Sequence, residues 1–136
     1  MEKRKVIVWF DDDAERYRLL MQDVENAGYE VHYIHDLRKS FKIAKDGRNF
    51  TDCVLIVMEP VHLHGIEGVP KPKSLISYIR NYAQCKAPII FLTMSDEDKK
   101  MLREFAGYGV VKILKKGKTF PRDLKREVEE VLNKSK

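Results

Sequence analysis

The stretch that most constrains the fold is an apolar run that leads directly into three consecutive carboxylates, KVIVWFDDD, over residues 5–13. Five apolar residues in a row, Val6 to Phe10, indicate a strand buried on both faces, as in a parallel sheet covered by helices on both sides. Acidic residues after such a strand lie at its carboxyl end, the edge where open α/β sheets bind ligands. The sequence therefore predicts a candidate site at Asp11 and Asp12, with Asp13 as the cap of the following helix.

The composition favours one soluble domain. The chain has 136 residues, of which 43% are hydrophobic and 35% charged, so it is long enough to bury a core without disulfides or metal. We therefore expect a single domain over residues 1–136. The longest apolar runs, 54–58 and 87–92, are far shorter than the ~20 residues of a membrane span, and the first residues lack the pattern of a secretory signal. We expect a cytoplasmic protein that does not act at a membrane.

The two cysteines carry no spacing motif. Cys53 lies in an apolar run and Cys85 in a polar connection, and no short spacing suggests a zinc site or a redox pair. We therefore expect two separate thiols in a reducing compartment.

An alternation of strands and helices continues along the rest of the chain. Apolar residues at helical spacing, together with capping residues, predict helices at residues 14–27, 37–44, 74–83, 96–105 and from 121 to the C-terminus. Apolar and β-branched runs predict further strands at residues 29–34, 53–58, 88–93 and 110–114. Five strands alternating with five helices predict an α/β protein with a doubly wound parallel sheet.

The helical spacing also predicts which side chains face the core and where helices begin and end. We expect Phe41 and Ala44 to point inward from the second helix, and Tyr82 to do so from the third together with Leu75 and Ile79. The last helix should bury Leu124, Val128, Val131 and Leu132. Ser74 is the expected cap of the third helix and Gly107 the expected stop of the fourth.

Three segments of the chain resemble the receiver domain of bacterial and archaeal response regulators. The first, VWFDDDAERYRLLMQDVENAGYEV, resembles the family's first strand, acidic pair, first helix and second strand. The second, APIIFLTMSDEDKKMLREFAGYG, resembles its fourth strand, strand-end hydroxyl and fourth helix, and VVKILKKG with PRDLKREVEEVL resembles its fifth strand, lysine and last helix. The resemblance covers Lys5 to about Leu132 and implies a flavodoxin-like five-stranded sheet with the strand order 2-1-3-4-5.

The same resemblance implies a function in two-component signalling. In this family an aspartate at the end of the third strand is phosphorylated by a histidine kinase in a magnesium-dependent switch. The resemblance assigns the acidic pair to Asp11 and Asp12, the hydroxyl to Thr93 and the lysine to Lys115 or Lys116. It implies protein partners, a histidine kinase or another signalling protein, and we do not expect the chain to be an enzyme or to bind nucleic acid.

The sequence departs from the family at the phosphoacceptor. If Pro60 is aligned with the family's proline, the acceptor position falls on Ile56, and if Asp52 is aligned with the acceptor strand instead, it falls on Val57. Neither side chain accepts phosphate, and the nearest acid is Glu59.

We therefore predict a degenerate, or pseudo, receiver that acts through protein contacts. The alternative is a phosphorylatable regulator that uses Glu59 or a nearby acid with magnesium. A basic nucleotide or nucleic-acid binder on the same fold is a third, less favoured alternative.

Magnesium is expected to bind weakly at most. With only Asp11 and Asp12 in place, the charge that compensates for dehydration of a hard cation is reduced, unless Glu59 completes the acidic pocket. If magnesium binds only weakly, Lys115 or Lys116 would neutralise the pair formed by Asp11 and Asp12. His62 and His64 are two residues apart in a long loop with no third ligand nearby, so we interpret them as solvated rather than as metal ligands.

A basic segment near the C-terminus suggests an interface. The net charge of +5 includes Lys112, Lys115 and Lys118, which would attract acidic partners. We expect the partner to dock on the face formed by the fourth helix, fifth strand and fifth helix, which is also the expected surface of any homodimer.

Overall fold

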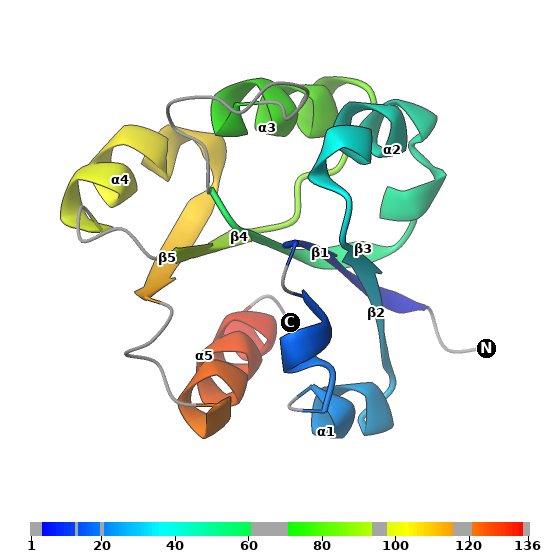
Figure 1. Cartoon of the computed structure of the whole chain (residues 1–136), viewed down its shortest axis with the longest axis vertical. Coiled ribbons are helices and arrows are strands. Elements are labelled where there is room, and N and C mark those ends of the chain that lie inside the picture. The colour runs from blue at the N-terminus through cyan, green and yellow to red at the C-terminus, as the bar shows by residue number, and fades with distance from the viewer. Residues whose placement is uncertain are drawn as a thin grey trace.

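A computed structural model of the protein describes residues 4–12, 14–19, 21–60, 71–93, 98–115 and 121–134. Its strands form one five-stranded sheet in the order β2-β1-β3-β4-β5, and every neighbouring pair is parallel (Figure 1). The strands are β1 (Lys5–Phe10), β2 (Tyr29–Ile34), β3 (Cys53–Met58), β4 (Ile89–Thr93) and β5 (Val110–Lys115). The predicted doubly wound sheet and its strand order are confirmed.

Helices cover both faces of the sheet (Figure 1). The α-helices are α1 (Gln22–Asn26), α2 (Ser40–Asp46), α3 (Pro72–Asn81), α4 (Asp98–Phe105) and α5 (Pro121–Lys134). Short 3₁₀ turns complete the connections: η1 (Ala14–Tyr17), η2 (Leu37–Lys39), η3 (Arg48–Phe50) and η4 (Ala106–Tyr108). One face of the sheet packs against α2, α3 and α4, and the other against α1 and α5. None of the described helices is both long and apolar enough to cross a membrane.

The continuous apolar run of β1 is explained by these two layers. Val6, Val8 and Phe10 pack into the core beneath α2 and α3, whereas Ile7 and Trp9 pack into the core beneath α1 and α5. All five side chains are fully buried. A strand in the middle of such a sheet has no face turned to water, so its sequence does not alternate.

The first predicted helix is interrupted. Residues 14–27 were expected to form one helix, but they form the 3₁₀ turn η1 and then the short helix α1. The backbone N–H groups of Arg18 and Gln22 donate to carbonyls three residues earlier, at Glu15 and Leu19, which is the tighter 3₁₀ pattern. Within η1, Tyr17 stacks on the buried Trp9 with ring centroids 5.5 Å apart.

Two predicted core positions lie at the surface instead. Phe41 is 36% exposed and Tyr82 is 59% exposed. The third helix begins at Pro72 rather than after Ser74, since proline suits a first helical position, and it ends at Asn81. Tyr82 directly follows the helix, still donates its N–H to the Tyr78 carbonyl, and stacks on the Tyr78 ring at the surface instead of entering the core. Ala44, Leu75 and Ile79 are buried, as are the four inward residues predicted for α5.

The fourth helix ends at Phe105, as predicted, but Gly107 is not the residue at which the chain turns. The residues expected to start it, 94–97, and the cap Asp13 lie outside the described residues. The helix does not stop at Gly107, because α4 passes into η4 and the chain turns at Gly109. Gly109 has φ +89°, in the left-handed region that favours glycine.

Arg80, on α3, forms hydrogen bonds with this turn and with the connection that follows α3. Its guanidinium donates to the carbonyl oxygens of Cys85 (2.8 Å), Ala87 (2.8 Å) and Tyr108 (3.0 Å). Burial lowers the pKa of Arg80 from its ordinary value, although a guanidinium stays charged. A Cβ atom on Gly109 would collide with this guanidinium.

We predict that Gly109→Ala destabilises the protein and that Gly107→Ala does not. The first change adds left-handed strain and displaces Arg80, which should lower the free energy of unfolding by about 2 kcal/mol. At Gly107 nothing lies within 4 Å of an added Cβ and the backbone is not left-handed, so the change should stay within about 0.5 kcal/mol. Urea denaturation measures both, and equal effects at the two glycines would contradict this role of Gly109.

Candidate functional site

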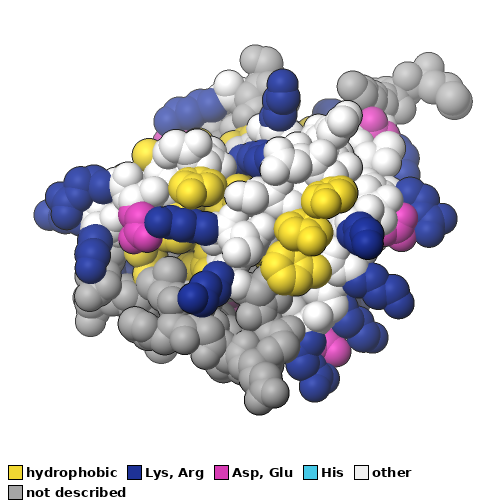
Figure 2. Space-filling view, turned by 90° about the horizontal axis from the view of Figure 1, so that it is seen from above, with side chains coloured by type: hydrophobic (Ala, Val, Ile, Leu, Met, Phe, Trp, Pro, Cys, Tyr) yellow, Lys and Arg dark blue, Asp and Glu magenta, His cyan; other side chains and the backbone are white. Residues whose placement is uncertain are grey.

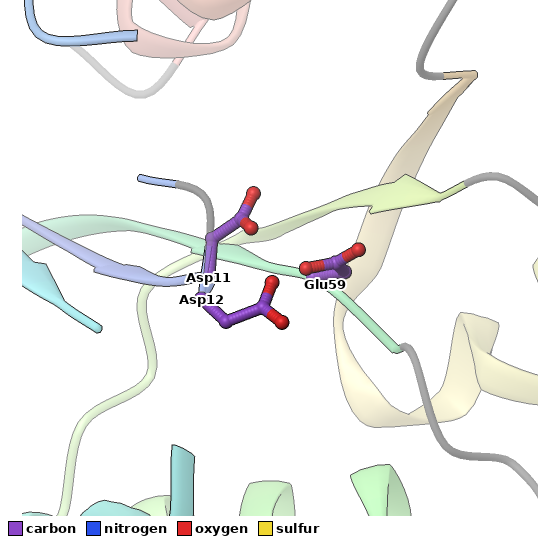
Figure 3. A group of neighbouring side chains, drawn as sticks. All are labelled: Asp11, Asp12 and Glu59. Atoms are coloured by element: carbon purple, nitrogen blue, oxygen red, sulfur yellow. The ribbon is translucent and has the colours of Figure 1, made fainter. Parts of the chain in front are cut away.

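Three carboxylates converge at the carboxyl edge of the sheet. Asp11 and Asp12 follow β1, and Glu59 follows β3. Phe10 pairs with Met58 in the parallel register, and the Glu59 N–H donates to the Phe10 carbonyl at 2.9 Å, so the acids leave the sheet side by side. One oxygen from each carboxylate lies within 4.8 Å of the others, and Figure 3 shows the three groups pointing toward one another.

This acidic triad, Asp11, Asp12 and Glu59, has the chemistry of a divalent-cation site. Asp11 is fully buried, Glu59 is partly buried and Asp12 is exposed. Negative charges this close repel one another, most strongly where water is excluded, and a cation among them removes that repulsion. Hard cations take oxygen ligands at about 2.0–2.6 Å, so oxygens within 4.8 Å of one another can share one ion. An all-oxygen donor set fits magnesium or calcium rather than zinc.

A hydroxyl and an ammonium group lie at the same edge. Thr93 ends β4 with 3% of its surface exposed, and Lys115 ends β5 as its register partner. Met58 on β3 pairs with Phe91 on β4. Glu59 follows Met58 by one residue and Thr93 follows Phe91 by two, so both lie at the same edge of the sheet. Lys116, the alternative site lysine, lies outside the described residues. The edge therefore combines the triad, a hydroxyl and a lysine.

Ile56 and Val57 do not belong to this site. Both are fully buried inside β3, where Ile56 faces the α2–α3 layer and Val57 faces the α1–α5 layer. The side chain beside the aspartates is Glu59, because β3 runs on to Met58 before the chain reaches the edge. The sequence left open whether Glu59 completes the acidic pocket, and its carboxylate does lie with those of Asp11 and Asp12.

The predicted basic interface has less free charge than its sequence suggested. Lys112 forms ion pairs with Glu127 and, at 3.2 Å, with Glu130, both on α5. Burial lowers the pKa of Lys112, but its hydrogen bonds with the two glutamates outweigh burial and hold the pKa above its ordinary value. Lys118 lies outside the described residues, as do His62 and His64. Lys112 is thus already neutralised within the chain.

A row of aromatic side chains lies over α2 and α3, on the side of the sheet opposite α1 and α5. The ring of Tyr78 lies between Phe41, at a centroid distance of 4.6 Å, and Tyr82, at 4.7 Å. Besides Lys73, which pairs with Glu104 at 2.8 Å, five exposed lysines lie in or beside these helices: Lys39, Lys42, Lys45, Lys71 and Lys86. No described carboxylate forms an ion pair with any of the five. Figure 2 views this layer and shows hydrophobic side chains grouped among lysines and arginines.

Comparisons with known proteins identify the fold. No family model matches the chain, and no curated protein matches it. Among solved structures, a CheY-like response regulator receiver domain protein from Methanospirillum hungatei JF-1 is 20% identical, with a TM-score of 0.68 over 98% of this chain and 97% of that one. The chemotaxis response regulator CheY4 of Vibrio cholerae is 22% identical, with a TM-score of 0.68 over 95% of this chain and 99% of that one.

A third solved structure agrees with these two. A two-component response regulator from Clostridium difficile is 21% identical, with a TM-score of 0.67 over 96% of this chain and 97% of that one. Likeness at this level of identity shows that the chain has the CheY-like, flavodoxin-type fold from end to end.

We predict that magnesium raises the melting temperature through the acidic triad. A site with a dissociation constant of about 1 mM would add roughly 4 °C at about 10 mM magnesium, compared with EDTA. Glu59→Gln should abolish this rise, and its melting temperature in EDTA should not fall, because the change removes one repelling charge.

The matched control is Glu129→Gln, which neutralises an exposed carboxylate on α5. It should keep the full response to magnesium. An equal response in wild type and Glu59→Gln, measured by thermal melts in both conditions, would show that the ion binds elsewhere.

Proposed function

We propose that the chain is a receiver-like signalling domain that acts through protein contacts, with a cation-binding carboxylate, Glu59, where receivers carry a phosphoacceptor aspartate. The observation that carries this proposal is the convergence of Glu59 with Asp11 and Asp12 at the carboxyl edge. The proposal is also supported by the CheY-like fold and by Thr93 and Lys115 at the same edge.

Glu59 is better suited to hold a cation than to accept a phosphoryl group. Its carboxyl carbon is one methylene farther from the backbone than that of an aspartate. Phosphoryl transfer depends almost entirely on positioning and electrostatics, and a displacement of about 1 Å can cost about 10²-fold in rate. Cation binding tolerates this longer reach, because the ion position adjusts with its ligands. Glu59 would therefore give the site a permanent negative charge that phosphorylation does not switch.

The alternative function is phosphorylation of Glu59 itself. A hydroxyl and an ammonium group near an acidic cation site are the groups that would contact the oxygens of a phosphoryl group. Thr93 and Lys115 supply both at this edge. The two functions differ in whether Glu59 forms an acyl phosphate.

We expect no phosphoryl adduct when the protein is incubated with acetyl phosphate and magnesium, because the Glu59 carboxylate is displaced from the position of an aspartate. Intact-mass spectrometry is the measurement, with a phosphorylatable receiver domain as the positive control. A single adduct that is lost in Glu59→Gln and retained in Glu129→Gln would replace the proposed function with the alternative.

We further propose that an acidic protein partner docks on the aromatic row of α2 and α3. Protein interfaces are enriched in aromatic residues and surround them with a polar rim, here supplied by exposed lysines that form no ion pair with a described carboxylate. The Tyr78 ring already contacts two neighbouring rings, so the row does not offer a series of separate rings on which nucleic-acid bases stack. The α4–β5–α5 face expected from the sequence is the competing surface.

Charge reversal on two helices distinguishes the two surfaces. Lys42→Glu with Lys45→Glu on α2 should weaken binding of an identified acidic partner by at least about tenfold and reduce its salt dependence. The control, Lys99→Glu with Lys100→Glu on α4, makes the same change of charge at two exposed lysines and should have little effect. Surface plasmon resonance measures both variants. The reverse ranking would place the interface on the α4–β5–α5 face.

A further inference from the structure

The fold brings the chain's two cysteines together. Cys53 opens β3, and Cys85 lies in the connection between α3 and β4. Cys85 is buried in the core beneath α2 and α3, Cys53 packs against the same core with its thiol donating to the Leu55 carbonyl at 3.3 Å, and the two thiols are close enough to shift each other's pKa. The two cysteines are free thiols, as the sequence predicted, but sequence spacing does not reveal that the fold places them near each other.

The strand register explains this contact. Ile56 pairs with Ile89, and the Ile56 N–H donates to the carbonyl of Pro88 at 3.0 Å. Cys53 lies three residues before Ile56 and Cys85 four residues before Ile89, so the two cysteines lie at the same end of this pairing, one position out of register. The backbone of Cys85 is held on both sides, because its carbonyl accepts from Arg80 at 2.8 Å and its N–H donates to Ile79 at 3.3 Å. The contact is thus a fixed feature of the fold.

The surroundings give the two sulfurs different chemistry. The neighbouring Cys53 thiol holds the pKa of Cys85 below its ordinary value against the opposing effect of burial, and the backbone N–H of Ala87 and the charge of Arg80 act in the same direction as Cys53. The neighbouring Cys85 thiol, together with burial, raises the pKa of Cys53. Cys85 is therefore the sulfur with thiolate character, and the thiolate is the reactive form of cysteine.

The cysteines lie just before the first residue pair of β3 and β4, which is the shortest strand pairing in the sheet. The β3–β4 register contains three residue pairs, from Ile56–Ile89 to Met58–Phe91. The β1–β3 and β4–β5 registers each contain five. The first half of β3 thus has no register partner on β4, and the cysteines are the groups that can join the two segments there.

We propose that Cys53 and Cys85 form a redox modification site, at which a peroxide converts the two thiols into an intramolecular disulfide between the start of β3 and the segment before β4. The Cys85 thiolate attacks one peroxide oxygen, the O–O bond breaks, hydroxide leaves and Cys85 becomes a sulfenic acid. The Cys53 sulfur then attacks the Cys85 sulfur, the S–O bond breaks and water leaves with the Cys53 proton. The peroxide is reduced to two molecules of water, and the two thiols are oxidised to one disulfide.

The disulfide would reinforce the sheet at the end opposite the acidic triad. It joins β3, which ends beside Glu59, to the segment that leads into β4, which ends at Thr93. Cross-linking removes chain entropy from the unfolded state and holds the two strands together where their own pairing stops. Oxidation therefore stabilises the two strands that position the site.

The test is intact-mass spectrometry of the reduced full chain after hydrogen peroxide treatment and alkylation of the remaining thiols. The expected product is a monomer that has lost two hydrogens, carries no alkyl group, yields one cross-linked peptide pair containing Cys53 and Cys85, and reverts with dithiothreitol. Its melting temperature should exceed that of the reduced chain by roughly 5 °C or more. Cys53→Ser and Cys85→Ser are the matched controls and should form no intramolecular disulfide.

Three outcomes would overturn the proposal. They are full alkylation of both thiols after peroxide treatment, disulfides only between chains, and a sulfinic or sulfonic acid on one cysteine while the other stays free. Each is read on the wild-type protein, so none depends on whether a cysteine variant folds. A magnesium response and an absence of phosphorylation are independent of these outcomes, so this proposal can fail while the proposed function stands.

Discussion

The candidate site depends on the parallel pairing of β1 with β3. The pair between Phe10 and Met58, extended by the hydrogen bond from the Glu59 N–H to the Phe10 carbonyl, brings two acidic segments from distant parts of the chain to one edge. A shift of one residue in this register would turn every β3 side chain to the other face of the sheet. Burial of Ile56 and Val57 in opposite cores prevents such a shift. The same packing that stabilises the sheet therefore sets the distance between the carboxylates.

Much of the fold could be predicted from local sequence patterns. The apolar runs gave β2 and β3 with their observed boundaries, and the inward face of α5 was predicted residue by residue, because these signals come from burial along a single element. The failures share one physical cause. The exposure of Phe41 and Tyr82 depends on how one element is placed against another, which no periodicity within a segment records, and the nearness of Cys53 to Cys85 depends on the same placement.

The two ends of the sheet have different chemistry. The carboxyl edge gathers oxygen ligands, a hydroxyl and an ammonium group, whereas the start of β3 lies beside a cysteine in a connection held by Arg80. β3 joins these two regions, with Cys53 at its beginning and Glu59 just beyond its end. Its hydrogen bonds to β4 extend over only half its length. This strand therefore connects the two candidate sites.

The most direct test of the central claim, that the acidic triad holds a divalent cation, is an anomalous difference map from crystals grown with manganese. Manganese takes the same oxygen ligands as magnesium and scatters anomalously. We expect a peak between Asp11, Asp12 and Glu59, with ligand distances of about 2.0–2.3 Å, and no peak there in Glu59→Gln crystals. A wild-type map in which the three carboxylates are well defined and no peak lies between them would contradict the claim.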